Sequence, residues 1–120
     1  MDNPLAFIVE DDEDASVIFA SALQEAGFEC EIIRAGDKAL VWLAETVPAV
    51  VVLDLELPGV SGMDILHQIR TDERLAETRV IIATAFPNLA ADLQDEADLV
   101  LLKPVSYIQL RDLSKRMGAV

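Results

Sequence analysis

Short apolar runs alternate along the chain with stretches in which apolar residues recur at helical spacing. Runs rich in Val, Ile and Leu at residues 5–9, 49–53, 79–83 and 99–102 predict strands. The run at 49–53 is so uniformly apolar that its strand is expected to be buried on both faces, as in a parallel sheet. Residues 29–34 form a half-polar run, which predicts a further strand at an edge of the sheet.

The segments between these runs carry helical patterns with local start and stop signals. The first predicted helix ends at Gly27, after an apolar stripe at positions 15, 18, 19, 22, 23 and 26. Asp37 is the predicted N-cap of the second helix, whose stripe reaches Val47. Ser61 is the predicted N-cap of the third helix, whose apolar positions are Ile65, Leu66 and Ile69.

The segment after the fourth predicted strand has the weakest helical pattern. Pro87 is expected to delay a helix of about two turns to residues 88–96, and residues 105–117 predict the last helix. Strands that alternate with helices form a parallel sheet, and right-handed crossovers place helices on both of its faces. We therefore expect a single doubly wound α/β domain over residues 1–120, with a five-stranded parallel sheet.

Composition and charge narrow the class of protein. The chain has 120 residues, 52% of them hydrophobic and 26% charged, which is enough for one globular core. A net charge of -13 disfavours direct binding to nucleic acid, because phosphate contacts need a basic surface. The single cysteine, Cys30, excludes an intrachain disulfide and is typical of a reducing cytoplasm. No apolar run approaches the roughly 20 residues that span a bilayer, so we expect no membrane partner and a cytoplasmic location.

Acidic residues follow two of the predicted strands. Asp54 ends the buried third run, and Glu10 and Asp11 follow the first. In a doubly wound sheet the carboxyl ends of the strands line one edge, where ligands bind. Two carboxylates about 4 Å apart repel each other by roughly 4 kcal/mol at an effective dielectric of 20, and a bound cation reverses that sign. The pattern therefore predicts a Mg²⁺ site.

Two further polar residues, Thr84 and Lys103, follow the fourth and fifth predicted strands. An aspartate such as Asp54 can accept a phosphoryl group as an acyl phosphate. Phosphoryl transfer needs mainly positioning and charge neutralisation. Lys103 and Mg²⁺ can supply the neutralisation, and the Thr84 hydroxyl can donate to a phosphoryl oxygen.

Five motifs, in this order, resemble the receiver domain of two-component response regulators, and the resemblance covers essentially the whole chain. It implies a flavodoxin-like fold with strand order 2-1-3-4-5. The motifs are Ile8-Val9-Glu10-Asp11-Asp12, Leu53-Asp54-Leu55-Glu56-Leu57-Pro58-Gly59, Ser61-Gly62, Ile81-Ile82-Ala83-Thr84-Ala85 and Lys103-Pro104.

The resemblance implies roles for the acidic residues. Asp54 matches the phosphoacceptor. Asp11 matches a direct Mg²⁺ ligand, and Asp54 is a second direct ligand. Glu10 matches the acid that acts on the metal through water, and the backbone carbonyl of Glu56 matches the third protein ligand. Asp12 falls outside the acid pair.

The resemblance also covers the polar residues after the fourth and fifth strands. Thr84 and Lys103 match the switch hydroxyl and the phosphate-binding lysine, and a cis Lys103-Pro104 peptide is expected. Two features depart from the family pattern. Val100 stands where a Tyr or Phe is usual, and the segment between Thr84 and Lys103 is shorter than usual. Both departures lie where the family usually transmits its signal.

The function implied is a signalling switch that catalyses only its own phosphorylation and dephosphorylation. It would take a phosphoryl group from a sensor histidine kinase or phosphotransfer protein and signal to a downstream effector protein or domain. One alternative is a phosphatase of the haloacid-dehalogenase type, but Glu56 stands where that class needs a second Asp. Another is a module that binds partners without phosphorylation. The chain ends soon after the last predicted helix, so we expect no effector domain within it.

Overall fold

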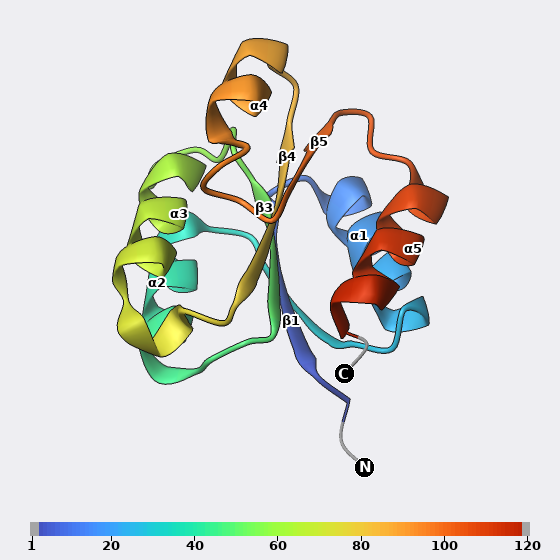
Figure 1. Cartoon of the computed structure of the whole chain (residues 1–120), viewed down its shortest axis with the longest axis horizontal. Coiled ribbons are helices and arrows are strands. Elements are labelled where there is room, and N and C mark those ends of the chain that lie inside the picture. The colour runs from blue at the N-terminus through green and yellow to red at the C-terminus, as the bar shows by residue number, and fades with distance from the viewer. Residues whose placement is uncertain (1–2, 119–120) are drawn as a thin grey trace.

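Five parallel strands form one sheet in residues 3–118, the part of the chain that this computed structural model describes (Figure 1). Their order is β2-β1-β3-β4-β5, which confirms the expected topology. Each strand lies within one residue of its predicted bounds. The strands are β1 (Leu5–Val9), β2 (Glu29–Ile33), β3 (Val50–Asp54), β4 (Arg79–Thr84) and β5 (Leu99–Leu102).

Helices cover both faces of the sheet, as the alternating pattern predicts. Helices α1 and α5 lie on one face, and α2, α3 and α4 lie on the other (Figure 1). No helix in residues 3–118 has the length and apolar character needed to cross a membrane. The helices are α1 (Glu13–Glu25), α2 (Gly36–Glu45), α3 (Gly62–Thr71), α4 (Pro87–Leu93) and α5 (Tyr107–Gly118), with a 3₁₀ turn, η1 (Glu73–Leu75), after α3.

Two hydrophobic cores share the central strands. Phe7 and Val51 point to the core beneath α2 and α3, whereas their neighbours Ile8 and Val52 point to the core beneath α1 and α5. Every residue of β3 is buried, because both of its faces are covered. The outer strand β2 is mostly exposed, as its half-polar sequence predicts.

The predicted N-cap of α2 is wrong. The cap residue is Ala35, which makes no side-chain capping bond, and Asp37 lies in the first turn. A Cβ at Gly36 would lie 2.5 Å from the carbonyl oxygen of Val60, so close packing against the β3–α3 loop sets this helix start. The contact between Gly36 and Val60, rather than the preference of Asp for the N-cap position, therefore determines where α2 begins.

Three other local predictions need correction. Val47 lies beyond α2 and is exposed, because Pro48 disfavours helical backbone in the residue before it. Ile18 belongs to the predicted apolar stripe of α1 but does not face the core, because it is 46% exposed. Helix α4 starts at Pro87, since proline is favourable in the first helical turn, and it ends at Leu93 rather than at residue 96.

Candidate functional site

The carboxyl ends of β1 and β3 bring three acidic side chains together. Asp54 is the last residue of β3, and Leu53 before it pairs with Val9 of β1, so Glu10 follows directly beside Asp54. Glu10 and Asp54 are buried, and Asp11 is exposed. One carboxylate oxygen from each of the three lies within 4.8 Å of the other two. The predicted acid cluster therefore forms.

Asp12 lies beside this cluster but serves the helix. Its Oδ2 accepts a hydrogen bond of 2.8 Å from the Ala15 N–H, so Asp12 is the N-cap of α1. The Asp12 N–H also donates to Glu10 Oε2 at 3.2 Å and holds that carboxylate in place. The structure thus separates Asp12 from the acids that face one another, as expected.

The loop between β3 and α3 is built on special backbone positions. Gly59 has φ of 75°, a left-handed conformation that suits the turn after Pro58. The Ser61 hydroxyl accepts from the Asp64 N–H at 3.2 Å and caps α3, which confirms its predicted role. This tight loop fixes the backbone that follows Asp54.

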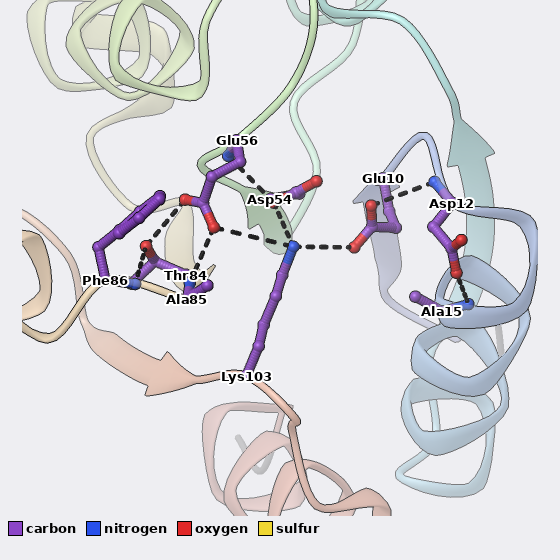
Figure 2. A network of polar contacts seen from close by, with 9 residues as sticks. All are labelled: Glu10, Asp12, Ala15, Asp54, Glu56, Thr84, Ala85, Phe86 and Lys103. Carbon is purple, nitrogen blue, oxygen red and sulfur yellow. Dashed lines mark hydrogen bonds and ion pairs between the residues drawn. The ribbon is translucent and has the colours of Figure 1, made fainter.

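Lys103 reaches into the acid cluster from the end of β5 (Figure 2). Its Nζ lies 2.6 Å from Asp54 Oδ1, 3.8 Å from Glu10 Oε1 and 4.0 Å from Glu56 Oε1. Its backbone N–H donates to the Thr84 carbonyl at 2.8 Å. The Lys103-Pro104 peptide is cis, as the resemblance implied.

Burial and ion pairing set the protonation of the site. Burial raises the pKa of Glu10 to about 7, and the adjacent Asp54 carboxylate acts in the same direction. Burial also tends to raise the pKa of Asp54, but contacts with Glu10 and Lys103 outweigh it and lower that pKa. Burial tends to lower the pKa of Lys103, yet the Asp54 carboxylate outweighs it and raises that pKa. Asp54 and Lys103 are therefore both charged at neutral pH.

The side chain of Glu56 takes part in the site, which sequence reasoning missed. Its Oε2 accepts from Thr84 Oγ1 and its Oε1 accepts from the Ala85 N–H, both at 2.8 Å. Only the backbone carbonyl of Glu56 was expected to matter. No local pattern signals the side-chain contact, because its partners lie 28 and 29 residues away and meet it only in the folded sheet.

The cluster fits a hard divalent cation. Glu10 Oε1 is buried and accepts no hydrogen bond from any residue in the described part of the chain. A buried carboxylate oxygen without a hydrogen bond is costly unless a cation or water satisfies it, and Lys103 Nζ at 3.8 Å lies beyond hydrogen-bond distance. Three carboxylates in reach of one another supply the oxygen ligands that Mg²⁺ prefers.

Comparison with known proteins agrees with this geometry. The model of the response regulator receiver domain matches residues 6–115. The phosphate regulon transcriptional regulatory protein PhoB of Rhizobium meliloti is 33% identical over 117 residues, which are 95% of this chain and 52% of that protein. The polar-differentiation response regulator DivK of Brucella ovis is 35% identical over 79 residues, 66% of this chain and 64% of DivK.

Solved structures agree as well. A response regulator receiver domain (CheY-like) from Methylobacillus flagellatus superimposes with a TM-score of 0.84 at 26% identity, over 96% of this chain and 98% of that one. The chain spans about half the length of the PhoB relative, 52% of it. Receiver domains are signalling modules that bind Mg²⁺ at an acidic pocket, and the cluster of Glu10, Asp11 and Asp54 corresponds to such a pocket. The chain belongs to the response regulator receiver domain family of two-component signalling.

Proposed function

We propose that residues 1–120 form one receiver domain that accepts a phosphoryl group on Asp54 and changes conformation in response. The donor would be a phosphohistidine of a sensor histidine kinase or phosphotransfer protein. The observation that carries this proposal is the 2.6 Å ion pair between Lys103 Nζ and Asp54 Oδ1 at a buried strand end. A charged amine beside an ionised carboxylate is placed to neutralise an incoming phosphoryl group.

The transfer follows from the groups present. A carboxylate oxygen of Asp54 attacks phosphorus, and the phosphorus–nitrogen bond to the donor imidazole breaks. The bonding electron pair goes to the imidazole nitrogen, and Asp54 becomes an acyl phosphate. Lys103 and the Thr84 hydroxyl then bind oxygens of the phosphoryl group, because both lie at the same edge of the sheet as Asp54.

The metal site would use residues of the same edge. We propose that Asp11, Asp54 and the backbone carbonyl of Glu56 hold Mg²⁺ directly, with Glu10 acting through a water molecule. Bound Mg²⁺ would neutralise charge on the carboxylates and on the phosphoryl oxygens. The buried Glu10 Oε1 that accepts no hydrogen bond within residues 3–118 supports this assignment.

The alternatives are weaker. A haloacid-dehalogenase-type phosphatase would need Asp where Glu56 stands, and its nucleophile usually lies on the first strand, whereas Asp54 ends β3. A module that works without phosphorylation would not need Asp54, Thr84 and Lys103 to converge. We therefore propose chemistry confined to the domain's own phosphorylation and dephosphorylation, with the signal read by an effector protein or domain.

The charge and the single cysteine support a proposal for the partners and location of the domain. A charge of -13 supports protein partners rather than direct contact with nucleic acid or an acidic membrane surface. The lone Cys30, a free thiol, supports a reducing cytoplasm.

Labelling with acetyl phosphate tests the function. Asp54→Asn should abolish incorporation of an acid- and base-labile phosphoryl group, because the amide cannot form an acyl phosphate. Asp14→Asn is the matched control, since Asp14 is an exposed acid in the first turn of α1. Full labelling of Asp54→Asn would overturn the assignment of Asp54. No labelling of the unmodified protein would favour the phosphorylation-independent module.

A further inference from the structure

The Glu56 carboxylate makes an unusual pair of contacts with the segment that follows β4. Its two oxygens accept from two successive residues, Thr84 through Oγ1 and Ala85 through its N–H (Figure 2). The same Thr84 hydroxyl accepts from the Phe86 N–H at 3.1 Å. One carboxylate therefore holds the start of the β4–α4 connection in a defined shape.

The Thr84 hydroxyl belongs to the site that the proposed function assigns to the phosphoryl group, and the Ala85 N–H lies directly beside it. Lys103 Nζ lies 4.0 Å from Glu56 Oε1, so a hydroxyl, an amide and an ammonium group all face one carboxylate. A carboxylate resembles a phosphoryl group in the features that matter here, since it carries negative charge and presents several oxygen acceptors. Glu56 thus has the chemistry of an internal substitute for the phosphoryl group.

We propose that the Glu56 side chain occupies the phosphoryl-oxygen position of the unphosphorylated domain and must leave it when Asp54 is phosphorylated. This inference rests on the proposed function. Oxygens of the new acyl phosphate would then take over the Thr84 hydroxyl and the Ala85 N–H. The Glu56 side chain is 27% exposed, so it has a route to solvent, whereas Thr84 is fully buried and keeps its place.

The exchange makes Glu56 a positioning residue that favours the unphosphorylated conformation. Hydrogen bonds to a charged acceptor are stronger than neutral ones, and the phosphoryl group must replace two of them. The negative charge of Glu56 also repels the incoming phosphoryl group. Removal of the carboxylate should therefore favour binding of a phosphoryl group or its mimic.

Beryllofluoride binding in saturating Mg²⁺ measures this competition. We expect Glu56→Ala to bind beryllofluoride about tenfold more tightly than the unmodified protein, because two charge-assisted hydrogen bonds no longer compete. Glu56→Gln removes the charge but keeps one acceptor oxygen, so its affinity should fall between the two. Asp14→Ala is the control, because it removes one exposed acid in the first turn of α1. It should bind beryllofluoride as tightly as the unmodified protein does.

Amide exchange of Ala85 separates the hydrogen-bond role from a general charge effect. Without beryllofluoride, the Ala85 amide should exchange faster in Glu56→Ala than in the unmodified protein, and beryllofluoride should restore its protection. Equal affinity and equal Ala85 exchange in the two proteins would overturn the inference. So would equal affinities of Glu56→Gln and Glu56→Ala, which would reduce the effect to charge. If the unmodified protein neither binds beryllofluoride nor is labelled, the proposed function fails instead.

Discussion

Gly62 places the start of α3 directly against the backbone of Asp54, the proposed phosphoacceptor. A Cβ at this position would lie 2.7 Å from the Asp54 carbonyl oxygen and 2.7 Å from the Leu55 Cα. Both atoms belong to the backbone, so they cannot move aside by a side-chain rotation. The absent side chain lets α3 begin immediately behind the end of β3.

We predict that Gly62→Ala destabilises the domain and weakens the acid site together. The added methyl group must push α3 away from β3, at a cost of about 1–3 kcal/mol in the free energy of unfolding. Urea denaturation measures the stability, and acetyl phosphate labelling measures the site. Gly27→Ala is the control for destabilisation away from the site. A Cβ at Gly27 meets nothing within 4 Å, so this variant only strains a backbone with positive φ. Its labelling should stay normal, and normal labelling of Gly62→Ala would contradict the prediction.

At the residue scale, the sequence predicted the site residues that lie within a recognisable local sequence pattern. Asp54 ends an apolar run and Lys103 precedes a proline, so a residue-by-residue reading found both. The Glu56 side chain escaped because its contacts with Thr84 and Ala85 depend on the neighbouring positions of β3 and β4. Long-range side-chain contacts of this kind follow from the register of the sheet and not from a local pattern.

At the element scale, a polar clamp holds the shortened connection between α4 and β5. Asp98 Oδ2 accepts from the Val80 N–H at 2.7 Å and from Arg70 of α3 at 2.9 Å. Arg70 also donates to the carbonyls of Glu96 at 2.7 Å and of Thr78 at 3.1 Å. These contacts join α3, β4 and the segment before β5.

We predict that Asp98→Ala lowers the free energy of unfolding by about 1–3 kcal/mol, because it leaves the Val80 N–H without its acceptor and removes the ion pair with Arg70. Asp95→Ala is the matched control, since Asp95 is an exposed acid in the same connection. Urea denaturation followed by circular dichroism gives both values. Equal stability of the two variants would show that the clamp does not stabilise the fold.

The same region is where we expect phosphorylation to be read. Val100 replaces the usual aromatic residue, is half-buried and pairs with Ile82 in the sheet. A β-branched side chain is stiff at its first torsion, so Val100 cannot swing between two sites as a ring can. We therefore expect the response to depend on Thr84 and on the short connection that follows it.

We predict that beryllofluoride with Mg²⁺ changes amide exchange mainly in residues 84–96. Ordering of the loop at 85–88 and movement of Thr84 would account for protection there. An alternative within the same segment is that α4 melts in one state and orders in the other. Asp54→Asn is the control and should show no change, because it lacks the carboxylate that binds beryllium. Absence of change anywhere in the unmodified protein would favour a domain that does not switch.

Element type and strand ends were predictable from the sequence, whereas the starts of α2 and α4 were not. All five strands and five helices follow from the alternation of apolar runs with helical stripes. The sequence predicts that α4 starts only after Pro87, but the missing N–H of proline costs nothing in the first helical turn, where that group has no partner. Gly36 starts α2 because of its contact with Val60, and such packing is invisible before the fold is known.

At the scale of the whole molecule, one sheet joins two cores to one charged edge. The central strands β1, β3 and β4 pack α2–α4 on one face and α1 with α5 on the other. Packing in both cores therefore fixes the distances between the carboxyl ends of these strands. That rigidity holds the Glu10 and Asp54 carboxyl groups side by side at the charged edge, in a chain with a net charge of -13.

Two electrostatic effects on stability should be separable for this reason. Added NaCl screens the general repulsion of a chain with a net charge of -13 and should raise the melting temperature of every variant. Mg²⁺ at constant ionic strength should raise it further, because it binds the native cluster. A concentration about ten times the dissociation constant is worth about 1.4 kcal/mol, or on the order of 5 °C.

We predict that Asp11→Asn loses most of the Mg²⁺ response and keeps the NaCl response, because it removes one ligand and leaves the overall charge nearly unchanged. Asp14→Asn removes the same charge from an exposed position and should keep both responses. Thermal denaturation with Mg²⁺, and again after chelation with EDTA, makes the comparison. An undiminished Mg²⁺ response in Asp11→Asn would place the cation elsewhere. Equal loss of the Mg²⁺ response in Asp11→Asn and Asp14→Asn would mean that general charge, not coordination at the sheet edge, explains the stabilisation.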